Sequence, residues 1–365
     1  MRILVDGLPR GMGGIGSLIL NIADYSRLCG DGDKVQFEYL VSGTSAYIPV
    51  LENKGYRFYM APKFSQIRDY RRFLRALFEK EKYDYLWFNN TSKVNTILPA
   101  YAKKYAGAKI ITHSHGVAPE EKGLKKMAFT ALDALHRRRM FQLCDVPFAC
   151  SQEAADIYYK YSGALRDQVL VVRNGILASG FKYSPEDRER VRAELGIDSG
   201  EICLGAVGRL AHVKNYPFII SLLPELPDKY KLVIVGEGED RAEMEALIRG
   251  LNLDSRCILI GRRSDVPAFL SAMDVFLLPS FHEGMPYSII EAQANGLPCI
   301  VSDTLSQELK LTDLVIFESI QDSRAWVRRI TAAKTAVDRA AMAGKIREKG
   351  YDIGETYRSI MEKLR

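Results

Sequence analysis

Two glutamates, Glu283 and Glu291, lie on either side of an expected helix start in the segment PSFHEGMPYSIIEAQANGLPCIVSD, residues 279–303. Carboxylate oxygens accept hydrogen bonds from sugar hydroxyls, and the free backbone amides of a helix start attract phosphate. This layout suits a ligand that is negatively charged and rich in hydroxyl groups. The competing interpretation is that Glu283 is a solvated loop residue and Glu291 a surface residue of the helix.

The elements that would position these glutamates are a strand, a helix and a second strand. The apolar run Val275–Leu278 predicts a strand buried on both faces. Pro286 predicts the first turn of a helix that ends at Ala294, and Cys299–Ser302 predicts the next strand of a parallel crossover. Because ligands of such sheets bind beyond the carboxyl ends of the strands, the helix start is expected to face a phosphate.

The spacing of this segment resembles the signature of a known enzyme family. Glu283, Gly284, Pro286 and Glu291, preceded by a strand and with seven residues between the glutamates, resemble the retaining group 1 glycosyltransferases of the GT-B fold. These enzymes include sugar transferases of exopolysaccharide, capsule and lipopolysaccharide synthesis. The resemblance covers nearly the whole chain and implies an α/β protein with two Rossmann-like, doubly wound parallel-sheet domains that face a central cleft.

The resemblance also implies the substrates and the roles of these residues. The second domain would hold a nucleoside diphosphate sugar, most simply a UDP-sugar, and the first would hold the hydroxyl of a saccharide or lipid-linked acceptor. Glu291 would accept hydrogen bonds from the ribose diol, and Glu283 would orient hydroxyls of the transferred sugar. The rest of the donor site would comprise five consecutive residues: Gly284, Met285, Pro286, Tyr287 and Ser288.

A basic pair, Arg209 and Lys214, follows the predicted strand Ile202–Val207. A guanidinium fork and an ammonium group at a strand end can neutralise a diphosphate, whereas Arg and Lys at such spacing are otherwise ordinary solvated surface. The pair matches the family pattern G-R-x(4)-K, which assigns it to the departing diphosphate. The family resemblance also places the nucleotide base beside Gly236 and Arg262, after the next two strands.

A glycine-rich segment follows the first predicted strand and satisfies GxGxxG over residues 11–16. Three interpretations remain open: a ligand-facing loop near the donor phosphates or the acceptor, a structural turn, and an NAD site. The resemblance favours the first and implicates Gly14 in donor binding. A dehydrogenase would also need an acidic residue at the end of the second strand, and residues 39–43 contain none.

Two histidines, His113 and His115, end another predicted strand and share one of its faces. A metal pair is conceivable, but no acidic or cysteine partner lies nearby at ligand spacing. In the resembled family a histidine at the end of this strand lies at the donor sugar. Matching Ser114-His115-Gly116 to the family pattern favours His115, while the register leaves His113 open.

The family chemistry would proceed without a metal or another cofactor. Arg209, Lys214 and the helix-start amides would stabilise the departing diphosphate, and the leaving phosphate would help to take the acceptor proton on the same face, so that anomeric configuration is retained. His115 and Glu283 would orient hydroxyls near the reacting carbon. A non-catalytic sugar-nucleotide sensor is an alternative that the sequence leaves open.

Length and strand rhythm predict two domains. A chain of 365 residues exceeds one ordinary core, and both halves alternate short apolar runs with helical patterns. We expect an acceptor-side domain over residues 1–172 and a nucleotide-sugar domain over 173–345, and the resemblance implies a final helix, 346–365, that packs back on the first domain. Strands are expected at 2–6, 36–41, 57–60, 85–88, 108–113, 146–151, 169–174, 202–207, 231–236, 257–260, 275–278 and 299–302.

The composition is that of an ordinary soluble protein, with 47% hydrophobic and 26% charged residues. The N-terminus lacks the pattern of a signal peptide, and no run approaches the roughly twenty apolar residues of a membrane span. Six cysteines without CxxC spacing predict neither zinc nor disulfides. A cytoplasmic location is therefore expected.

The positive charge is concentrated in the first half of the chain. Residues 1–170 contain 25 Lys and Arg against 17 Asp and Glu, whereas residues 171–365 contain 26 against 28. A basic amphipathic stretch over residues 122–141 could lie on an anionic membrane surface, or it could be a core-facing helix with a solvated basic face. Nucleic acid is not expected as a partner, because aromatic residues do not interleave with the cations.

Overall fold

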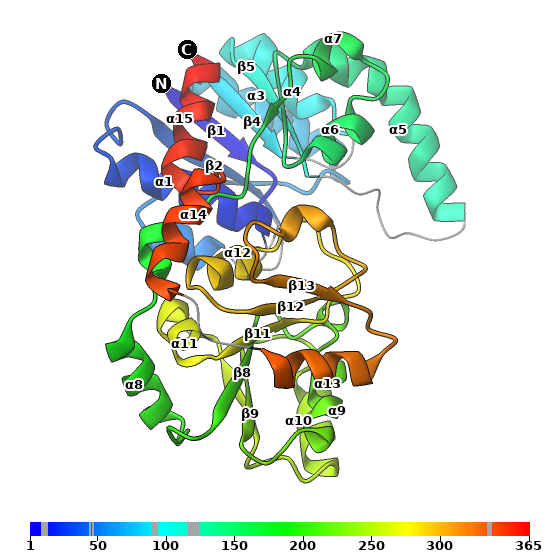
Figure 1. The fold of residues 1–365 in the computed structure, drawn as a ribbon. Coiled ribbons are helices and arrows are strands. Elements are labelled where there is room, and N and C mark those ends of the chain that lie inside the picture. The colour runs from blue at the N-terminus through cyan, green and yellow to red at the C-terminus, as the bar shows by residue number, and fades with distance from the viewer. Residues whose placement is uncertain (9–13, 44, 46, 90–93, 116–123, 334–337) are drawn as a thin grey trace. The chain divides into compact units, whose positions relative to one another are not determined.

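The computed structural model describes residues 1–8, 14–43, 45, 47–89, 94–115, 124–333 and 338–365, with the backbone alone for 124–130. The chain divides into two compact units, Met1–Gly175 with Ile353–Arg365, and Ile176–Asp352. Each unit has its own parallel sheet (Figure 1). The division after Gly175 lies close to the boundary expected at residue 172. Residues 346–352, expected in the final helix, lie in the second unit because Ile346 is buried in its core.

Among its described residues, the first unit has a seven-stranded parallel sheet with the order β3-β2-β1-β4-β5-β6-β7. The strand order therefore reverses between β1 and β4, as in other doubly wound sheets. The strands are β1 (Arg2–Asp6), β2 (Gln36–Ser42), β3 (Phe58–Ala61), β4 (Tyr85–Asn89), β5 (Lys109–Ser114), β6 (Val146–Ala149) and β7 (Leu170–Val171).

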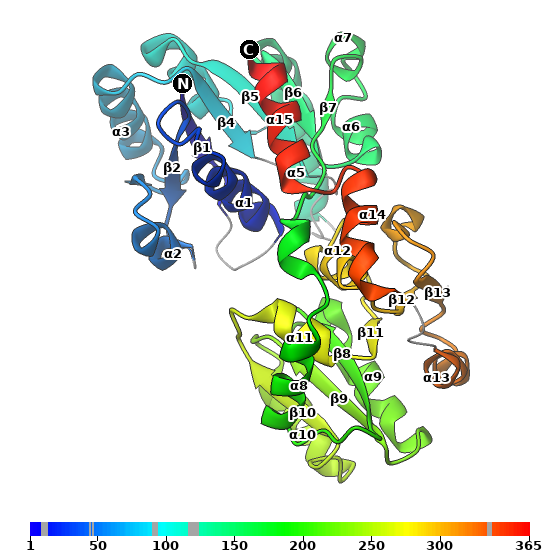
Figure 2. The ribbon, with the colours of Figure 1, turned by 60° about the vertical axis from the view of Figure 1, so that its left-hand side comes forward.

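Helices cover this sheet and complete the first core. Buried side chains of β1, β2, β4 and β5 pack with α3, α4 and Met140 of α5. The C-terminal helix α15 lies beside α1 (Figure 2), where the Tyr25 and Tyr357 rings are 5.7 Å apart. The helices are α1 (Gly14–Leu28), α2 (Ile48–Asn53), α3 (Ile67–Lys80), α4 (Ile97–Tyr101), the π-helix η1 (Ala102–Ala106), α5 (Leu124–Leu143), α6 (Gln152–Tyr158), α7 (Gly163–Arg166) and α15 (Ile353–Leu364).

The described residues of the second unit form a six-stranded parallel sheet with the order β10-β9-β8-β11-β12-β13. Its order reverses between β8 and β11. The strand β13 was not expected from the sequence, because it is an edge strand in which only Val315 of its four residues is buried. The strands are β8 (Ile202–Val207), β9 (Tyr230–Val235), β10 (Cys257–Gly261), β11 (Val275–Leu278), β12 (Cys299–Ser302) and β13 (Val315–Glu318).

Two cores lie on the two faces of this second sheet. One packs the sheet against α8, α11, α12 and α14, and the other packs it against α9, α10 and α13 (Figure 1). The helices are α8 (Pro185–Glu194), α9 (Tyr216–Leu222), α10 (Arg241–Gly250), α11 (Val266–Ala272), α12 (Tyr287–Ala294), α13 (Ser323–Ala332) and α14 (Met342–Glu348). Short 3₁₀ helices are η2 (Ala178–Phe181), η3 (His212–Lys214), η4 (Leu223–Glu225), η5 (Gln307–Leu309) and η6 (Arg339–Ala341).

The expected start of α12 is shifted in the structure. Pro286 is the N-cap of α12 rather than part of its first turn, because its backbone is extended, with φ −69° and ψ 134°. The helix after the first strand, α1, begins at Gly14. Gly14 and Gly16 are therefore helical residues, whereas residues 11–13 of the glycine motif lie outside the described residues.

The third glycine of the GxGxxG motif, Gly16, has a packing reason for lacking a side chain. A Cβ at this position would lie 2.2 Å from the ring of Tyr47, which is buried. In the interior of a helix Ala is ordinarily more stable than Gly by about 1 kcal/mol. At Gly16 the clash outweighs this preference, so that alanine is expected to be less stable than glycine. The buried Tyr47 ring cannot move aside without disturbing its neighbours.

We expect Gly16→Ala to destabilise the protein by about 1–3 kcal/mol, the usual cost of overpacking. Urea unfolding would measure the change. Gly163→Ala is the matched control, because a Cβ at Gly163 would meet no atom within 4 Å. If Gly16→Ala were as stable as the wild type or more stable, the contact with Tyr47 would not explain this glycine.

Candidate functional site

The carboxyl ends of β8 and β11 are the point at which the strand order of the second sheet reverses. These strands pair only through Val275 with Leu204 and Phe276 with Gly205. The helices that follow them, α9 and α12, pack on opposite faces of the sheet. The loops after the two strands therefore diverge, which is the arrangement that binds ligands in doubly wound sheets.

Two hydrogen bonds join these diverging loops. The amide of Phe281 donates to the carbonyl of Val213 at 2.9 Å, and the side-chain amide of Asn215 donates to the carbonyl of Pro279 at 3.2 Å. Asn215 adopts a left-handed conformation with φ 52° and ψ 37°, which asparagine tolerates better than most residues. This turn ends η3 immediately after Lys214 and leads into α9.

Lys214 and Glu283, predicted for different parts of the ligand, form an ion pair across the two loops. Only 13% and 15% of their side-chain surfaces are exposed. The Ser280 hydroxyl donates a second hydrogen bond to the Glu283 carboxylate at 2.9 Å. Since both charges are largely removed from water, each depends strongly on the other.

Glu291 lies in the second turn of α12, on the same segment but in a different environment. Burial raises the pKa of its carboxyl to about 7, although part of the residue remains exposed. The two glutamates therefore differ in their surroundings. Glu283 forms an ion pair with Lys214, whereas burial favours the protonated form of Glu291.

The remaining residues predicted for the donor segment lie around the start of α12. Gly284 is exposed, and a Cβ there would meet open space. Met285 and Tyr287 are partly buried against the core that contains α12, while Pro286 and Ser288 are buried. These residues are consequently half embedded in the domain.

Arg209, Gly236 and Arg262 occupy the loops after β8, β9 and β10, as expected. The Arg209 side chain is half exposed, and its guanidinium group lies 3.7 Å from the Glu239 carboxylate. Arg209 therefore forms an ion pair that is separate from the Lys214–Glu283 pair. Arg262 is exposed. Gly236 has a structural explanation, since a Cβ there would lie 1.8 Å from the carbonyl oxygen of Gly208.

A second polar cluster lies at the carboxyl edge of the first unit's sheet. Asn89, at the end of β4, donates from its side-chain NH₂ to the carbonyl of Asp6 at 3.0 Å. Its Oδ1 lies 2.9 Å from Nε2 of His115 and must accept that hydrogen bond. The proton of His115 is therefore on Nε2, which leaves Nδ1 as a hydrogen-bond acceptor.

The structure separates the two histidines that the sequence left open. His113 is buried, its Nδ1 accepts a hydrogen bond from the Trp87 indole at 3.3 Å, and its ring lies 4.0 Å from that of His115. His115 remains partly exposed, and burial lowers its pKa to about 4, so it is neutral at physiological pH. Among the described residues, no group of three or more His, Cys, Asp or Glu side chains could hold a metal ion.

Sequence reasoning missed Asp6 and Asn89 as members of this cluster. Burial raises the pKa of the Asp6 carboxyl to about 7. Both are polar residues at the last position of a buried strand, which is a signal that the sequence contained. Their proximity follows from the pairing of β1 with β4, which the sequence does not reveal.

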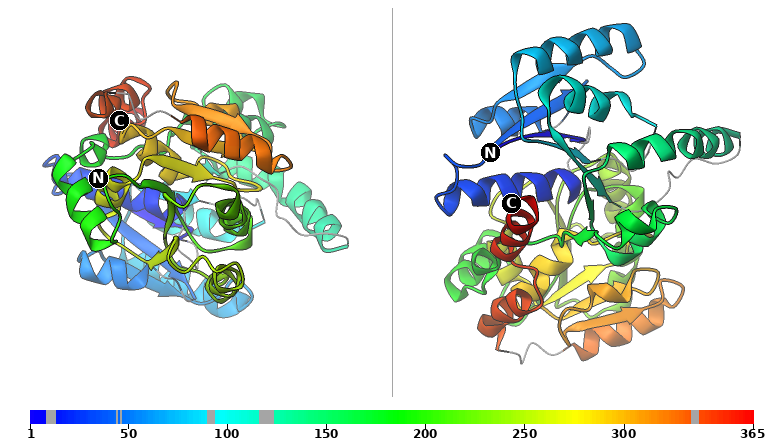
Figure 3. Two further views of the ribbon diagram at one scale, coloured as in Figure 1. Left: turned by 60° about the horizontal axis from the view of Figure 1, so that its bottom comes forward. Right: turned by 90° about the horizontal axis from the view of Figure 1, so that it is seen from above.

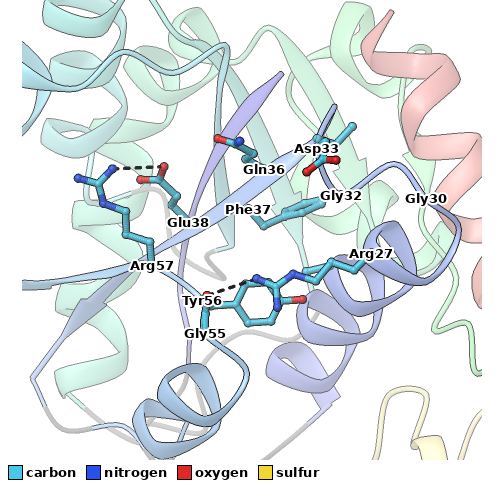
Figure 4. Close-up of a pocket in the computed structure, with 12 residues that line it drawn as sticks. Arg27, Gly30, Gly32, Asp33, Gln36, Phe37, Glu38, Gly55, Tyr56 and Arg57 are labelled. Atoms are coloured by element: carbon cyan, nitrogen blue, oxygen red, sulfur yellow. Dashed lines mark hydrogen bonds and ion pairs between the residues drawn. The ribbon is translucent and has the colours of Figure 1, made fainter.

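A depression of about 590 Å³ in the first unit lies at the opposite edge of the sheet (Figure 4). It is lined by the start of β2, including Gln36 and Glu38, and by Tyr56 and Arg57 just before β3. Its two arginines already have partners, since Arg57 pairs with Glu81 at 2.9 Å and Arg27 stacks on the Tyr56 ring at 3.6 Å. This depression is not at the ligand-binding edge of the sheet.

Over the described residues, no helix combines the length and the apolar character needed to cross a bilayer.

Comparison with known proteins defines first the fold and then the family. The Anabaena protein HepE, solved in complex with UDP, superposes with a TM-score of 0.78 at 19% identity, covering 100% of this chain and 99% of HepE. The lipopolysaccharide glycosyltransferase WaaG gives a TM-score of 0.68 at 18% identity, over 100% and 98%. The predicted GT-B fold is therefore confirmed.

Family models match both halves of the chain: Glycosyltransferase Family 4 over residues 12–178 and Glycosyl transferases group 1 over residues 187–345. The putative glycosyltransferase EpsF of Bacillus subtilis is 26% identical, over 98% of this chain and 94% of EpsF. An Escherichia coli enzyme named UDP-Gal:alpha-D-GlcNAc-diphosphoundecaprenol alpha-1,3-galactosyltransferase is 32% identical, over 63% of this chain and 60% of that enzyme. The chain belongs to the group 1 glycosyltransferases, as the Glu283–Glu291 segment predicted.

We expect the two glutamates to affect stability in opposite directions. The Glu291 pKa is about 7 in the folded protein against an ordinary value of 4.5, so between these values stability falls as pH rises, because the folded state retains a proton that the unfolded chain releases. Glu291→Gln removes this cost and should raise the melting temperature at pH 8, with a smaller effect at pH 5. Glu283→Gln should lower it at pH 8, since Lys214 loses its partner. Thermal unfolding at both pH values would measure this, and equal shifts in both variants would contradict the assignment.

Proposed function

We propose that this glycosyltransferase moves a sugar from a nucleoside diphosphate sugar, most simply a UDP-sugar, to an acceptor hydroxyl with retention of configuration. The observation that carries the proposal is the Lys214–Glu283 pair at the reversal point of the second sheet. It combines an ammonium group for a diphosphate with a carboxylate for sugar hydroxyls. A site for a nucleoside alone would need only the second of these chemistries.

The donor would extend from this pair along α12. Lys214 and Arg209 would neutralise the diphosphate together with the amides at the helix start, and Arg209 would exchange Glu239 for a phosphate. Glu291 would accept hydrogen bonds from the ribose diol, which favour its ionised form. The UDP and UDP-glucose complexes of HepE and the UDP-Gal in the name of the E. coli relative support the choice of uridine.

The reaction would break the bond between the anomeric carbon and the diphosphate oxygen and form the bond to the acceptor oxygen on the same face. The acceptor proton would pass to the leaving diphosphate, whose developing charge Lys214 and Arg209 would stabilise. Glu283 would hold sugar hydroxyls. His115 would accept a hydrogen bond from a sugar hydroxyl at Nδ1, the nitrogen that Asn89 leaves as an acceptor. No metal or other cofactor takes part in this proposal.

The acceptor would be a growing or lipid-linked saccharide of a cell-surface polysaccharide, and the enzyme would act on the cytoplasmic side of the membrane. The name of the E. coli relative includes a diphosphoundecaprenol acceptor. In this chain, α5 extends away from the sheet of the first unit (Figure 3). None of its described side chains from Ala131 to Arg139 is buried, and Leu132 and Leu135 are 46% and 75% exposed beside Arg137, Arg138 and Arg139.

We expect the two glutamates to separate donor affinity from turnover. Glu291→Gln should weaken UDP-sugar binding about tenfold or more, the usual effect of losing hydrogen bonds to a charged group. Glu283→Gln should mainly lower kcat. Steady-state kinetics with candidate UDP- and GDP-sugars would measure both, with Glu225→Gln, an exposed residue ahead of β9, as the control. Wild-type kinetics in both variants would refute the site.

Such kinetics would also separate a transferase from a sugar-nucleotide sensor. A transferase turns over the donor, slowly by hydrolysis when no acceptor is added. A sensor would bind the same donor without releasing the nucleoside diphosphate.

The membrane proposal predicts that α5 carries the affinity for anionic lipid. Arg138→Gln combined with Arg139→Gln should weaken binding to vesicles containing phosphatidylglycerol about thirtyfold, because each cation near the surface contributes about 1 kcal/mol. Arg71→Gln with Arg72→Gln, two exposed cations of α3, removes the same charge elsewhere and should have little effect. Vesicle co-sedimentation would measure both, and equal losses would argue against docking through α5.

A further inference from the structure

Tyr216, the first residue of α9, has a buried hydroxyl without a hydrogen-bond partner among the described residues. The whole residue is 1% exposed. A buried hydroxyl that makes no hydrogen bond costs about 1–3 kcal/mol relative to one that does. Such groups in folded proteins usually have a reason, and a change of partners during function is one of them.

The hydroxyl lies beside the Lys214–Glu283 pair. A Cβ built on Gly208 would be 2.7 Å from the Tyr216 hydroxyl oxygen and 3.4 Å from the Lys214 ammonium nitrogen. Both polar groups therefore lie next to this glycine. Burial, with a further contribution from the nearby Glu283 carboxylate, raises the pKa of the Tyr216 hydroxyl. The group therefore keeps its proton and can act as a hydrogen-bond donor.

Two anionic groups would compete for the ammonium group of Lys214. Lys214 neutralises Glu283 in this structure, and the proposed function assigns the same ammonium group to the donor diphosphate. A diphosphate carries more charge than a carboxylate and competes strongly for an ammonium group. Glu283 would then remain poorly exposed with only the Ser280 hydroxyl as a partner.

We propose that Tyr216 is a positioning residue whose hydroxyl donates to Glu283 when Lys214 turns to the diphosphate. The exchange keeps the carboxylate fixed while it orients sugar hydroxyls. The inference rests on the proposed function for the ligand, but the exchange of hydrogen-bond partners is a property of the three side chains alone. After the exchange Tyr216 would contact Glu283 and not the reacting atoms, so it would act through that carboxylate.

A thermodynamic cycle tests the exchange without any substrate. Tyr216→Phe in the wild-type background should leave the melting temperature unchanged or raise it, because the hydroxyl has no partner there. In a Lys214→Met background Glu283 has lost its cation, so Tyr216→Phe should lower the melting temperature by about 2–4 °C, corresponding to about 1 kcal/mol in a domain of this size. Lys214→Gln provides a second background. Equal shifts of Tyr216→Phe in all backgrounds would overturn the proposal.

Kinetics of the same variant test the positioning role. Tyr216→Phe should lower kcat about tenfold while the dissociation constant for UDP stays within about twofold, as expected when one hydrogen bond to a charged group is lost during turnover. Tyr39→Phe is the matched control, since Tyr39 in β2 is also buried with an unpartnered hydroxyl. Unchanged kcat, or a tenfold loss of UDP affinity instead, would contradict positioning through Glu283.

These measurements separate the two proposals. If wild-type protein neither bound UDP nor turned over a nucleotide sugar, the proposed function would fail, while the thermodynamic cycle would still decide whether Tyr216 replaces Lys214 as the partner of Glu283.

Discussion

The ion pair between Lys214 and Glu283 is the interaction on which the arrangement of the site depends. Its two side chains come from the loops after β8 and β11, which are neighbours only because the strand order reverses between them. The left-handed turn at Asn215 and the hydrogen bond from Phe281 to Val213 hold these loops together. Since both charges are largely buried, neither can lose its partner without another group taking its place.

In the first unit, hydrogen bonds between neutral groups likewise connect loops at the carboxyl edge of the sheet. Asn89 at the end of β4 links the carbonyl of Asp6, at the end of β1, to His115 just after β5. The side-chain amide of Asn89 therefore links the ends of β1 and β4 and also determines the tautomer of His115. In each unit a polar side chain at the reversal of the strand order connects loops that are distant in sequence, and burial of these groups makes the connection specific.

The sequence predicted the bounds of four strands. The strands β1, β8, β11 and β12 have their predicted bounds, because each is a short apolar run between polar or turn residues. β13 was missed because only one of its four residues is buried. The Lys214–Glu283 contact, the amide of Asn89 and the hydroxyl of Tyr216 could not be predicted, since each depends on which strands are neighbours and on a partner from another segment. The burial of His113 likewise could not be predicted, since its partner Trp87 comes from the adjacent strand.

The most direct test of this account is a crystal structure of the protein with UDP, grown in the presence of a chelator. The account predicts the diphosphate at the carboxyl ends of β8 and β11, with the Lys214 ammonium group within hydrogen-bond distance of a phosphate oxygen and the ribose diol on Glu291. UDP bound elsewhere, with Lys214 still paired to Glu283, would contradict it.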